Sequence, residues 1–242
     1  MSSIKVSPFG AYLTSWKIKG REVLYQGSEI KRTGIPLLFP NFDFGPPLPN
    51  HGFGRISNWQ VIKIDSDSCH LRLTENDISL EFRQIYPYEF ILDLKINAIN
   101  NQLNYMIEVK NTGIKDIPIS PGLHPYWPIK HSQKSQIKII DFPKFNPQIT
   151  DWDNNPPNSL YDFDGNFMAN FPDYQLIIKD ISPKNIYFSH LQIWSQNTSF
   201  PDYNFVCFEP VTRAPNSINT NPILISSNKT EMFYLQFKVI LP

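Results

Sequence analysis

Short runs of residues that alternate between apolar and polar side chains, separated by turn residues, recur along most of this chain. Residues 12–18 alternate in this way, and Lys19-Gly20-Arg21 turns the chain back into residues 22–25, which predicts a hairpin. No window shows a helical period with capping residues. The other predicted strands are residues 58–64, 69–74, 78–85, 90–97, 103–111, 135–140, 175–179, 186–194, 205–208 and 231–240. The pattern therefore predicts an all-β protein, an antiparallel sandwich or barrel of many strands.

The composition fits a compact β protein and argues against several partners. Of the 242 residues, 41% are hydrophobic and only 18% are charged, which suits one large all-β domain or two small ones. Lys plus Arg and Asp plus Glu each total 22, so the net charge draws the chain to neither nucleic acid nor an anionic membrane. No apolar run approaches the roughly 20 residues of a spanning helix and no leader is present, so we expect a soluble, cytoplasmic protein. Cys69 and Cys207 match no metal-ligand spacing; we expect buried free thiols, although a disulfide stays open.

Two long stretches depart from the strand pattern. Residues 31–55 are rich in proline, glycine and aromatic rings, which makes them too irregular for a strand and too apolar for a free linker. Such a loop either packs against the body and builds a site or covers an open sheet edge, and both interpretations stay open. Residues 143–173 are rich in Asn, Asp and Pro, and this composition predicts a surface excursion.

One histidine stands in a stiff, ring-lined setting, in Pro121-Gly122-Leu123-His124-Pro125-Tyr126-Trp127-Pro128. The prolines disfavour regular ladder pairing, and the two aromatic rings could form the floor of a pocket. Because the unperturbed pKa of histidine lies nearest neutrality, His124 is a candidate acid or base. The alternative is a packed structural histidine.

A second imidazole and a guanidinium occur together in His51-Gly52-Phe53-Gly54-Arg55. The glycines let the backbone approach a ligand closely, and Arg55 could bind hydroxyls or a phosphate. His51 and His124 could share a metal ion, but the chain has no HxH, HExxH or CxxC arrangement, so we expect no metal site. Nucleophilic catalysis is also disfavoured, since there is no G-x-S-x-G motif and no cysteine in a polar, basic setting.

A carboxylate follows the apolar run 205–208. Glu209 directly precedes Pro210, which we expect to end the strand, and it is poorly placed to be a solvated surface charge. Either a cation such as Arg213 pairs with it, or burial raises its pKa and makes it a general base.

Five segments carry a family resemblance. They are RTGIPLLFP at residues 32–40, HGFGR with Trp59 at 51–59, YPYEF at 86–90, GLHPY at 122–126, and CFEP with Pro215-Asn216 at 207–216. In these segments, which span essentially the whole chain, the sequence resembles the aldose 1-epimerase (galactose mutarotase-like) family, most of all the short branch that includes hexose-6-phosphate epimerases. The resemblance implies one galactose mutarotase-like domain over residues 1–242, a large antiparallel β-sandwich whose concave face binds a sugar.

The same resemblance implies a reaction, the interconversion of α and β anomers of a sugar without any cofactor. Glu209 resembles the general base that takes the proton from the anomeric hydroxyl, and His124 resembles the general acid that protonates the ring oxygen. His51 resembles the imidazole that helps to hold the sugar, and Arg32 the guanidinium near its hydroxyls. Further substrate-binding candidates are Arg55, Tyr126 and an acidic residue, for which Asp164 is the first choice and Asp162 the second.

The sequence leaves the substrate and part of the function open. Lys31, Arg32 and Arg55 could bind a phosphate, but the neutral net charge leaves a free hexose equally open. Small departures from the family pattern occur at Arg32-Thr33-Gly34, where Arg-Gly-Gly is usual, and at Gly54, where alanine is usual. The alternatives are a non-catalytic carbohydrate-binding or regulatory protein on the same fold and, more remotely, a purely structural β-sandwich. Retention of both His124 and Glu209 favours the enzyme, since a binding protein needs no acid and base.

Overall fold

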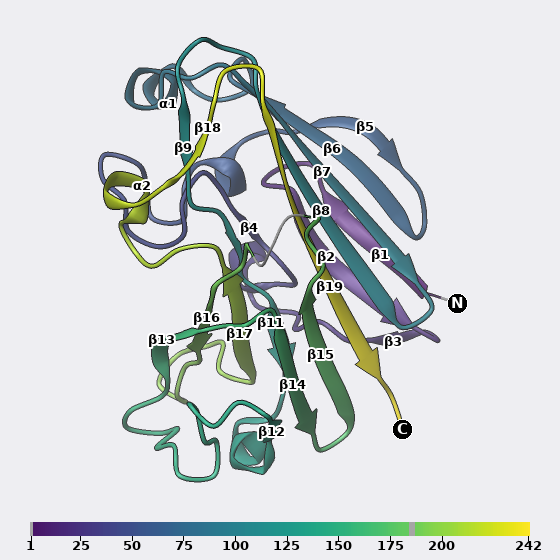
Figure 1. The fold of residues 1–242 in the computed structure, drawn as a ribbon. Coiled ribbons are helices and arrows are strands. Elements are labelled where there is room, and N and C mark those ends of the chain that lie inside the picture. Colours follow the sequence, from purple (N-terminus) through teal and green to yellow (C-terminus); the bar gives the residue numbers. More distant parts are fainter. Residues whose placement is uncertain (1, 184–186) are drawn as a thin grey trace.

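Strands dominate the computed structural model, which describes residues 2–183 and 187–242 (Figure 1). The strands are β1 (Ser2–Ser7), β2 (Tyr12–Ile18), β3 (Arg21–Glu22), β4 (Leu37–Leu38), β5 (Gln60–Ile64), β6 (Ser68–Thr74), β7 (Phe90–Ile99), β8 (Gln102–Asn111), β9 (Ile117–Ile119), β10 (Gly122–Leu123), β11 (Tyr126–Pro128), β12 (Lys138–Ile140), β13 (Asn158–Asp162), β14 (Asn166–Phe171), β15 (Tyr174–Asp180), β16 (His190–Trp194), β17 (Phe205–Val211), β18 (Ile223–Ile225) and β19 (Thr230–Ile240). The helices are α1 (Leu80–Ile85) and α2 (Ser217–Thr220), with single 3₁₀ turns η1 (Ile30–Arg32), η2 (Gly54–Ile56) and η3 (His131–Gln136).

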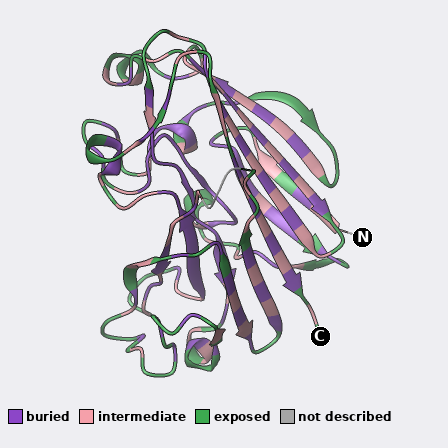
Figure 2. Cartoon of the chain, in the orientation of Figure 1, coloured by how far each residue is buried: buried purple, intermediate pink, exposed green. Residues whose placement is uncertain are grey.

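The largest sheet has eight strands in the order β12-β14-β15-β19-β8-β7-β6-β5, all paired antiparallel. Its long strands alternate buried and partly exposed residues, because successive side chains point to opposite faces of a sheet (Figure 2). In β7, for example, Phe90, Leu92 and Leu94 face inward. One face of this sheet therefore covers the core.

A second layer packs on the buried face of the large sheet. It contains β13-β16-β17-β10-β4, with β11 also paired to β17, together with the three-stranded sheet β1-β2-β3. A fourth, two-stranded sheet joins β18 to β9. Side chains from all these layers form one continuous hydrophobic core that runs from Ile4 to Val239. The chain is an antiparallel β-sandwich, as its sequence predicts.

Most predicted strands are confirmed, but several boundaries are wrong. The hairpin of β2 and β3 turns at Lys19-Gly20, both with positive φ, and β7 pairs with β8 across Asn100-Asn101. The prediction of a strand over residues 78–85 is wrong, because Ser79 caps a helix there: its hydroxyl accepts a hydrogen bond from the Phe82 amide. Of the predicted strand 135–140, only Lys138–Ile140 pairs, and in 186–194 pairing begins at His190, with Ile186 outside the described residues.

The proline-rich stretches are more regular than expected. Pro210 does not end β17, which continues to Val211, since an extended strand accommodates the φ of proline and loses only one donor. Around His124, the short strands β10 and β11 both pair with β17 despite their prolines. The predicted surface excursion 143–173 contains β13 and β14, so that interpretation is only partly right. Residues 31–55 do pack against the body, and β4 also extends the sheet beside β10.

Candidate functional site

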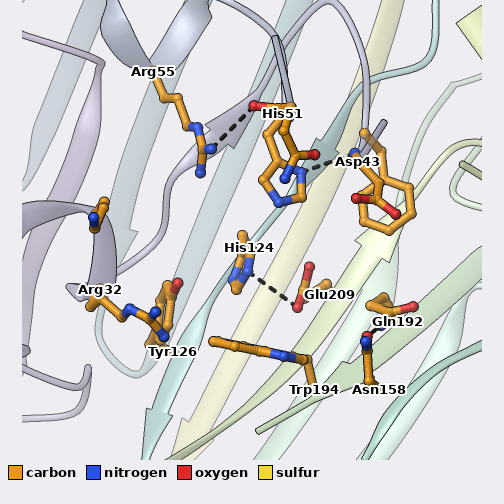
Figure 3. A pocket seen from close by; sticks show the side chains of 13 residues that line it. Arg32, Asp43, His51, Arg55, His124, Tyr126, Asn158, Gln192, Trp194 and Glu209 are labelled. Carbon is orange, nitrogen blue, oxygen red and sulfur yellow. Dashed lines mark hydrogen bonds and ion pairs between the residues drawn. The ribbon is translucent and has the colours of Figure 1, made fainter. Parts of the chain in front are cut away.

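A cavity of about 410 Å³ opens on the six-stranded sheet beneath the segment 31–55 (Figure 3). This volume lies in the range of small-molecule sites. Residues from the loops on one side and from β11, β13, β16 and β17 on the other surround it. The lining residues are Lys31, Arg32, Phe42, Asp43, Asn50, His51, Arg55, His124, Tyr126, Asn158, Gln192, Trp194 and Glu209.

The central strand β17 brings the carboxylate to the floor of this cavity. Val206 and Phe208 point into the main core, whereas Phe205 and Cys207 belong to a separate cluster on the opposite face. Because side chains alternate along a strand, Glu209 shares the face of Cys207 and lines the cavity. Every residue of β17 is buried, which explains why its sequence shows no alternation of polar and apolar residues.

The break between β10 and β11 places His124 opposite Glu209. The His124 amide donates to the Pro36 carbonyl at 3.0 Å, and the ring stacks on Tyr126 at a centroid distance of 4.6 Å. Its Nε2 atom lies 3.4 Å from Oε1 of Glu209. Gly122 allows β10 to lie close to β17, since a Cβ at this position would lie 2.7 Å from Cγ1 of Val211. A buried imidazole and a buried carboxylate therefore face each other at the cavity.

His51 is fixed above this pair by its own loop. It has a positive φ of 62°, and its Nδ1 accepts a hydrogen bond of 2.9 Å from the Asp43 amide. The rings of His51 and His124 meet edge to face at 5.7 Å. Nearby, Arg55 donates from Nη2 to the Asn50 carbonyl at 3.1 Å. The segment 31–55 therefore carries an imidazole, a carboxylate and a guanidinium on one wall of the cavity.

The opposite walls combine aromatic faces with amides. The Arg32 guanidinium lies 5.2 Å from the centre of the Trp194 ring, and that ring stands edge-on to His124. On the other side of Glu209, Nε2 of Gln192 donates to Oδ1 of Asn158 at 2.8 Å (Figure 3). Cations thus gather at one end of the cavity and neutral amides at the other.

Burial moves the pKa values of the central groups toward their uncharged forms. Desolvation raises the pKa of Glu209 well above 4.5, and the nearby Asp43 adds to the rise. Desolvation lowers the pKa of His124 well below 6.5, and the same cause, with Arg55, lowers that of His51 to about 3. A protonated carboxyl beside a neutral imidazole holds the same single proton as a carboxylate beside an imidazolium. Between the lowered pKa of His124 and the raised pKa of Glu209, the pair therefore holds one proton in either form.

His124, Cys207 and Glu209 also offer three ligand atoms within 4.8 Å of one another. A metal ion would need the thiolate of Cys207, but burial raises the pKa of this thiol well above 9. The same burial disfavours the Glu209 carboxylate. Burial thus favours the uncharged thiol and the uncharged carboxyl, and neither of these is a good ligand for a cation. Both cysteines are free and buried, as the sequence predicts.

The structure brings together the residues selected from the sequence, except both candidates for the acidic residue. Arg32, His51, Arg55, Tyr126, His124 and Glu209 line the cavity. Asp164 does not: it is an exposed residue of the β13–β14 turn, where Oδ1 accepts a hydrogen bond from the Asn166 amide. Asp162 is also exposed, at the end of β13, and pairs with Lys144. The acidic residue in the cavity besides Glu209 is Asp43.

Sequence reasoning missed six polar or aromatic lining residues, namely Phe42, Asp43, Asn50, Asn158, Gln192 and Trp194. A signal existed for two of them. Gln192 and Trp194 lie two positions apart on one strand face and pair with Glu209 and Cys207 respectively. Placing β16 beside β17 would therefore have placed both next to the predicted base.

Comparison with known proteins agrees with this arrangement of sheet and cavity. The model of the aldose 1-epimerase family matches residues 1–162. The chain belongs to the aldose 1-epimerase family. A relative in this comparison is the uncharacterized protein YphB of Escherichia coli strain K12, which is 21% identical over 83% of this chain and 71% of its own length.

Solved structures share the fold of this aldose 1-epimerase family member at low sequence identity. The Slr1438 protein of Synechocystis sp. PCC 6803 superposes with a TM-score of 0.79 at 18% identity, over 99% of this chain and 92% of that chain. A galactose mutarotase related enzyme from Lactobacillus acidophilus gives 0.77 at 18% identity, over 99% and 94%. The galactose 1-epimerase of Lactobacillus acidophilus NCFM gives 0.65 at 14% identity, over 99% and 91%. At these identities the likeness establishes the galactose mutarotase-like fold alone.

Proposed function

We propose that this protein is an aldose 1-epimerase that interconverts the α and β anomers of a hexose or hexose phosphate by acid–base ring opening and closure. The observation that carries the proposal is the pairing of His124 with Glu209, 3.4 Å apart and both almost fully buried, at the floor of a cavity of sugar-binding size. The family membership supports the same reaction class.

The reaction needs one proton removed and one proton supplied. Glu209, as the carboxylate, takes the proton of the anomeric hydroxyl while His124, as the imidazolium, gives a proton to the ring oxygen, and the bond from C1 to the ring oxygen breaks. Rotation about the C1–C2 bond turns the aldehyde, and the reverse transfers close the ring on its other face. The pair ends with the proton it began with, so no cofactor is consumed. Each positioned group contributes roughly 10² to 10⁴ in rate.

The other lining residues suit the binding of a sugar. Tyr126 and Trp194 offer aromatic faces to the apolar face of the ring. The neighbouring Asn158 and Gln192 offer donors and acceptors for hydroxyls. His51, whose Nδ1 accepts from the backbone, keeps Nε2–H as a donor toward the cavity. Arg32, Arg55 and Lys31 at the other end suit either hydroxyls or a phosphate.

The test is saturation-transfer NMR between the α and β anomers at equilibrium, with glucose, galactose and glucose 6-phosphate in turn. We expect wild type to accelerate exchange of at least one of these sugars, and we expect the acceleration to persist in EDTA. Glu209→Gln should lose at least about 100-fold of it, since the amide accepts no proton. Glu108→Gln is the matched control, because Glu108 lies on β8, away from the cavity, and pairs with Lys95 of β7.

The outcomes separate an enzyme from a binding protein. Exchange that is accelerated by wild type and lost in Glu209→Gln supports the proposal, and the sugar that responds defines the substrate. Binding of sugar without accelerated exchange would instead indicate a non-catalytic carbohydrate-binding protein on the same fold. Exchange that is equally fast in Glu209→Gln would refute the role of Glu209.

A further inference from the structure

Arg32 is held at the cavity by an amide. Its Nη1 donates a hydrogen bond of 2.6 Å to Oε1 of Gln196, a residue 164 positions away in the sequence. Among the described residues, no carboxylate forms an ion pair with this guanidinium. A carboxylate partner would neutralise the arginine, whereas the amide fixes its direction and leaves its charge and remaining donors for a ligand.

A buried lysine holds the backbone of Gln196 in place. The side chain of Lys134 is fully buried, and its Nζ donates to the backbone carbonyl of Gln196 at 2.8 Å. The same amine lies 3.2 Å from Nδ1 of His131, whose Nε2 lies 2.8 Å from Oδ1 of Asp153. Because an ammonium group only donates, Nδ1 of His131 accepts and Nε2–H donates to Asp153. Donors and acceptors therefore match along the whole series from Asp153 to Arg32.

Burying the amine of Lys134 costs free energy that its contacts must offset. Burial disfavours the charge of the Lys134 amine and lowers its pKa to about 8, although Nζ lies 5.4 Å from the centre of the Trp152 ring in a cation–π contact that favours the charge. A buried charge is seldom retained for stability alone, because an apolar side chain of similar size often packs as well. The hydrogen bond that Lys134 donates to Gln196 fixes the backbone carbonyl of that residue.

A second contact holds the same two segments together. Asp202 accepts hydrogen bonds from the Tyr25 hydroxyl at 2.9 Å and from the Ser28 hydroxyl at 2.6 Å. Tyr25 and Ser28 lie just before η1, the 3₁₀ turn that ends in Arg32. The Ser28 amide also donates to Asp202, at 3.0 Å, so the loop after β16 holds the arginine-bearing segment through Asp202 and holds the Arg32 side chain through Gln196.

We propose that Gln196, anchored by Lys134, is a positioning residue that aims the Arg32 guanidinium into the cavity and thereby sets the affinity for substrate. The inference rests on the proposed function for its kinetic consequence. Arg32 contacts neither His124 nor Glu209 by any hydrogen bond or ion pair between described residues, so its direction governs binding rather than proton transfer.

The kinetic test uses Gln196→Ala, Arg32→Ala and the double variant, assayed by anomer exchange on the responding sugar. Each single variant should raise KM roughly 5- to 20-fold with kcat within about 2-fold, because a positioning defect removes uniform binding. In the Arg32→Ala background, Gln196→Ala should add less than about 2-fold, since both changes remove one interaction. Gln196→Glu, which keeps an acceptor oxygen for Arg32, should restore much of the affinity for a neutral sugar. Gln60→Ala is the control, because Gln60 is an exposed residue of β5 that bonds Asp77.

A second readout does not depend on activity. In protein with ¹⁵N-labelled arginine, the Arg32 Nη signals, identified by their loss in Arg32→Lys, should show slow guanidinium rotation in wild type and faster rotation in Gln196→Ala and Lys134→Met. Unchanged rotation in Gln196→Ala would overturn the inference even if the protein accelerates no exchange. Multiplying KM effects in the double variant, or a fall in kcat at constant KM, would overturn it as well. Absent exchange with altered Arg32 rotation would refute the proposed function and leave the positioning role supported.

Discussion

Two carboxylates of the described chain are almost fully buried, and their surroundings give them opposite properties. Asp202 accepts hydrogen bonds from Tyr25 and Ser28, and these bonds, against its burial, lower its pKa. Glu209 has only His124 as a described partner, so desolvation dominates and raises its pKa. The charged form of Asp202 is therefore favoured and holds the structure, whereas the raised pKa of Glu209 suits a group that gains and loses a proton during a reaction.

The single proton of the His124–Glu209 pair predicts a bell-shaped pH profile. At low pH the imidazole takes up a second proton, and because its pKa is lowered this acid limb should lie below pH 6.5. At high pH the pair loses its only proton, and because the pKa of Glu209 is raised this limb should lie well above pH 4.5. Measuring kcat/KM for anomer exchange from about pH 4 to about pH 10 checks both limbs. A rate that rises steadily across this range would contradict the shared proton.

His51 should link stability to pH. Its pKa falls from 6.5 to about 3 on folding, so the unfolded chain binds more protons between these values and stability should be lost as pH falls from 6.5 toward 3. Each pKa unit corresponds to about 1.4 kcal/mol. His51→Asn keeps an acceptor for the Asp43 amide, tolerates the positive φ and cannot titrate.

Thermal unfolding of both proteins at several pH values gives the measurement. We expect the melting temperature of His51→Asn to fall less than that of wild type as pH drops below 6.5. A constant difference between the two proteins across this range would show that His51 does not titrate on unfolding.

At the scale of elements, the cavity is formed by a few short strands and by the segment 31–55, which packs against them. Leu13 of β2 and Ile35 exchange backbone hydrogen bonds, with Ile35 N donating to Leu13 O at 2.9 Å. Gly34 makes this possible: it has a φ of +68°, and a Cβ there would lie 1.8 Å from the Leu13 carbonyl oxygen. The backbone of this glycine thus anchors the segment that carries Arg32 and His51.

Gly34→Ala should destabilise the protein strongly, by about 3 kcal/mol or more, through backbone strain together with the clash. The matched control is Gly20→Ala, whose φ of +84° is also positive but whose Cβ would meet nothing within 4 Å. Strain alone should cost the control about 1 kcal/mol. Urea unfolding midpoints compare the two variants. Equal losses of unfolding free energy in the two variants would show that the close contact with Leu13 does not contribute to the effect of Gly34→Ala.

The misassigned helix α1 illustrates how element prediction fails here. Residues 78–85 alternate well enough for a strand, but Ser79 supplies a cap and Glu81 lies in the first turn. No residue of this short helix is fully buried, and its apolar face consists of only Phe82 and Ile85, partly buried against the core, which is too short a pattern to mark a helix in the sequence. In contrast, β7, β8 and β19 bury every second residue, and their prediction is confirmed.

At the scale of the whole molecule, the C-terminal strand depends on strands from the middle of the chain. β19 near the C-terminus pairs with both β8 and β15 in the middle of the large sheet. The family model matches residues 1–162, while Gln192, Trp194 and Glu209 lie beyond that range and complete the cavity. None of the described helices is long and apolar enough to cross a membrane.

We propose that residues 1–242 form one domain, because a single hydrophobic core extends from Ile4 to Val239. The expected result is one cooperative unfolding transition, with the same midpoint by tryptophan fluorescence and by far-ultraviolet circular dichroism. Two separated transitions, or midpoints that differ between the probes, would contradict a single domain.

The sequence by itself determined the β class and most long strands, and its family resemblance indicated His124 and Glu209 as candidates for the site. These depend on local information: a period of two along each strand, and short motifs around each residue. Only the tertiary structure decided that Asp43, Asn158, Gln192 and Trp194 share the cavity, that Asp164 stays outside it, and that Gln196 meets Arg32. Those facts depend on which strands pair and in what register, and such contacts join residues far apart in the chain that no local pattern connects.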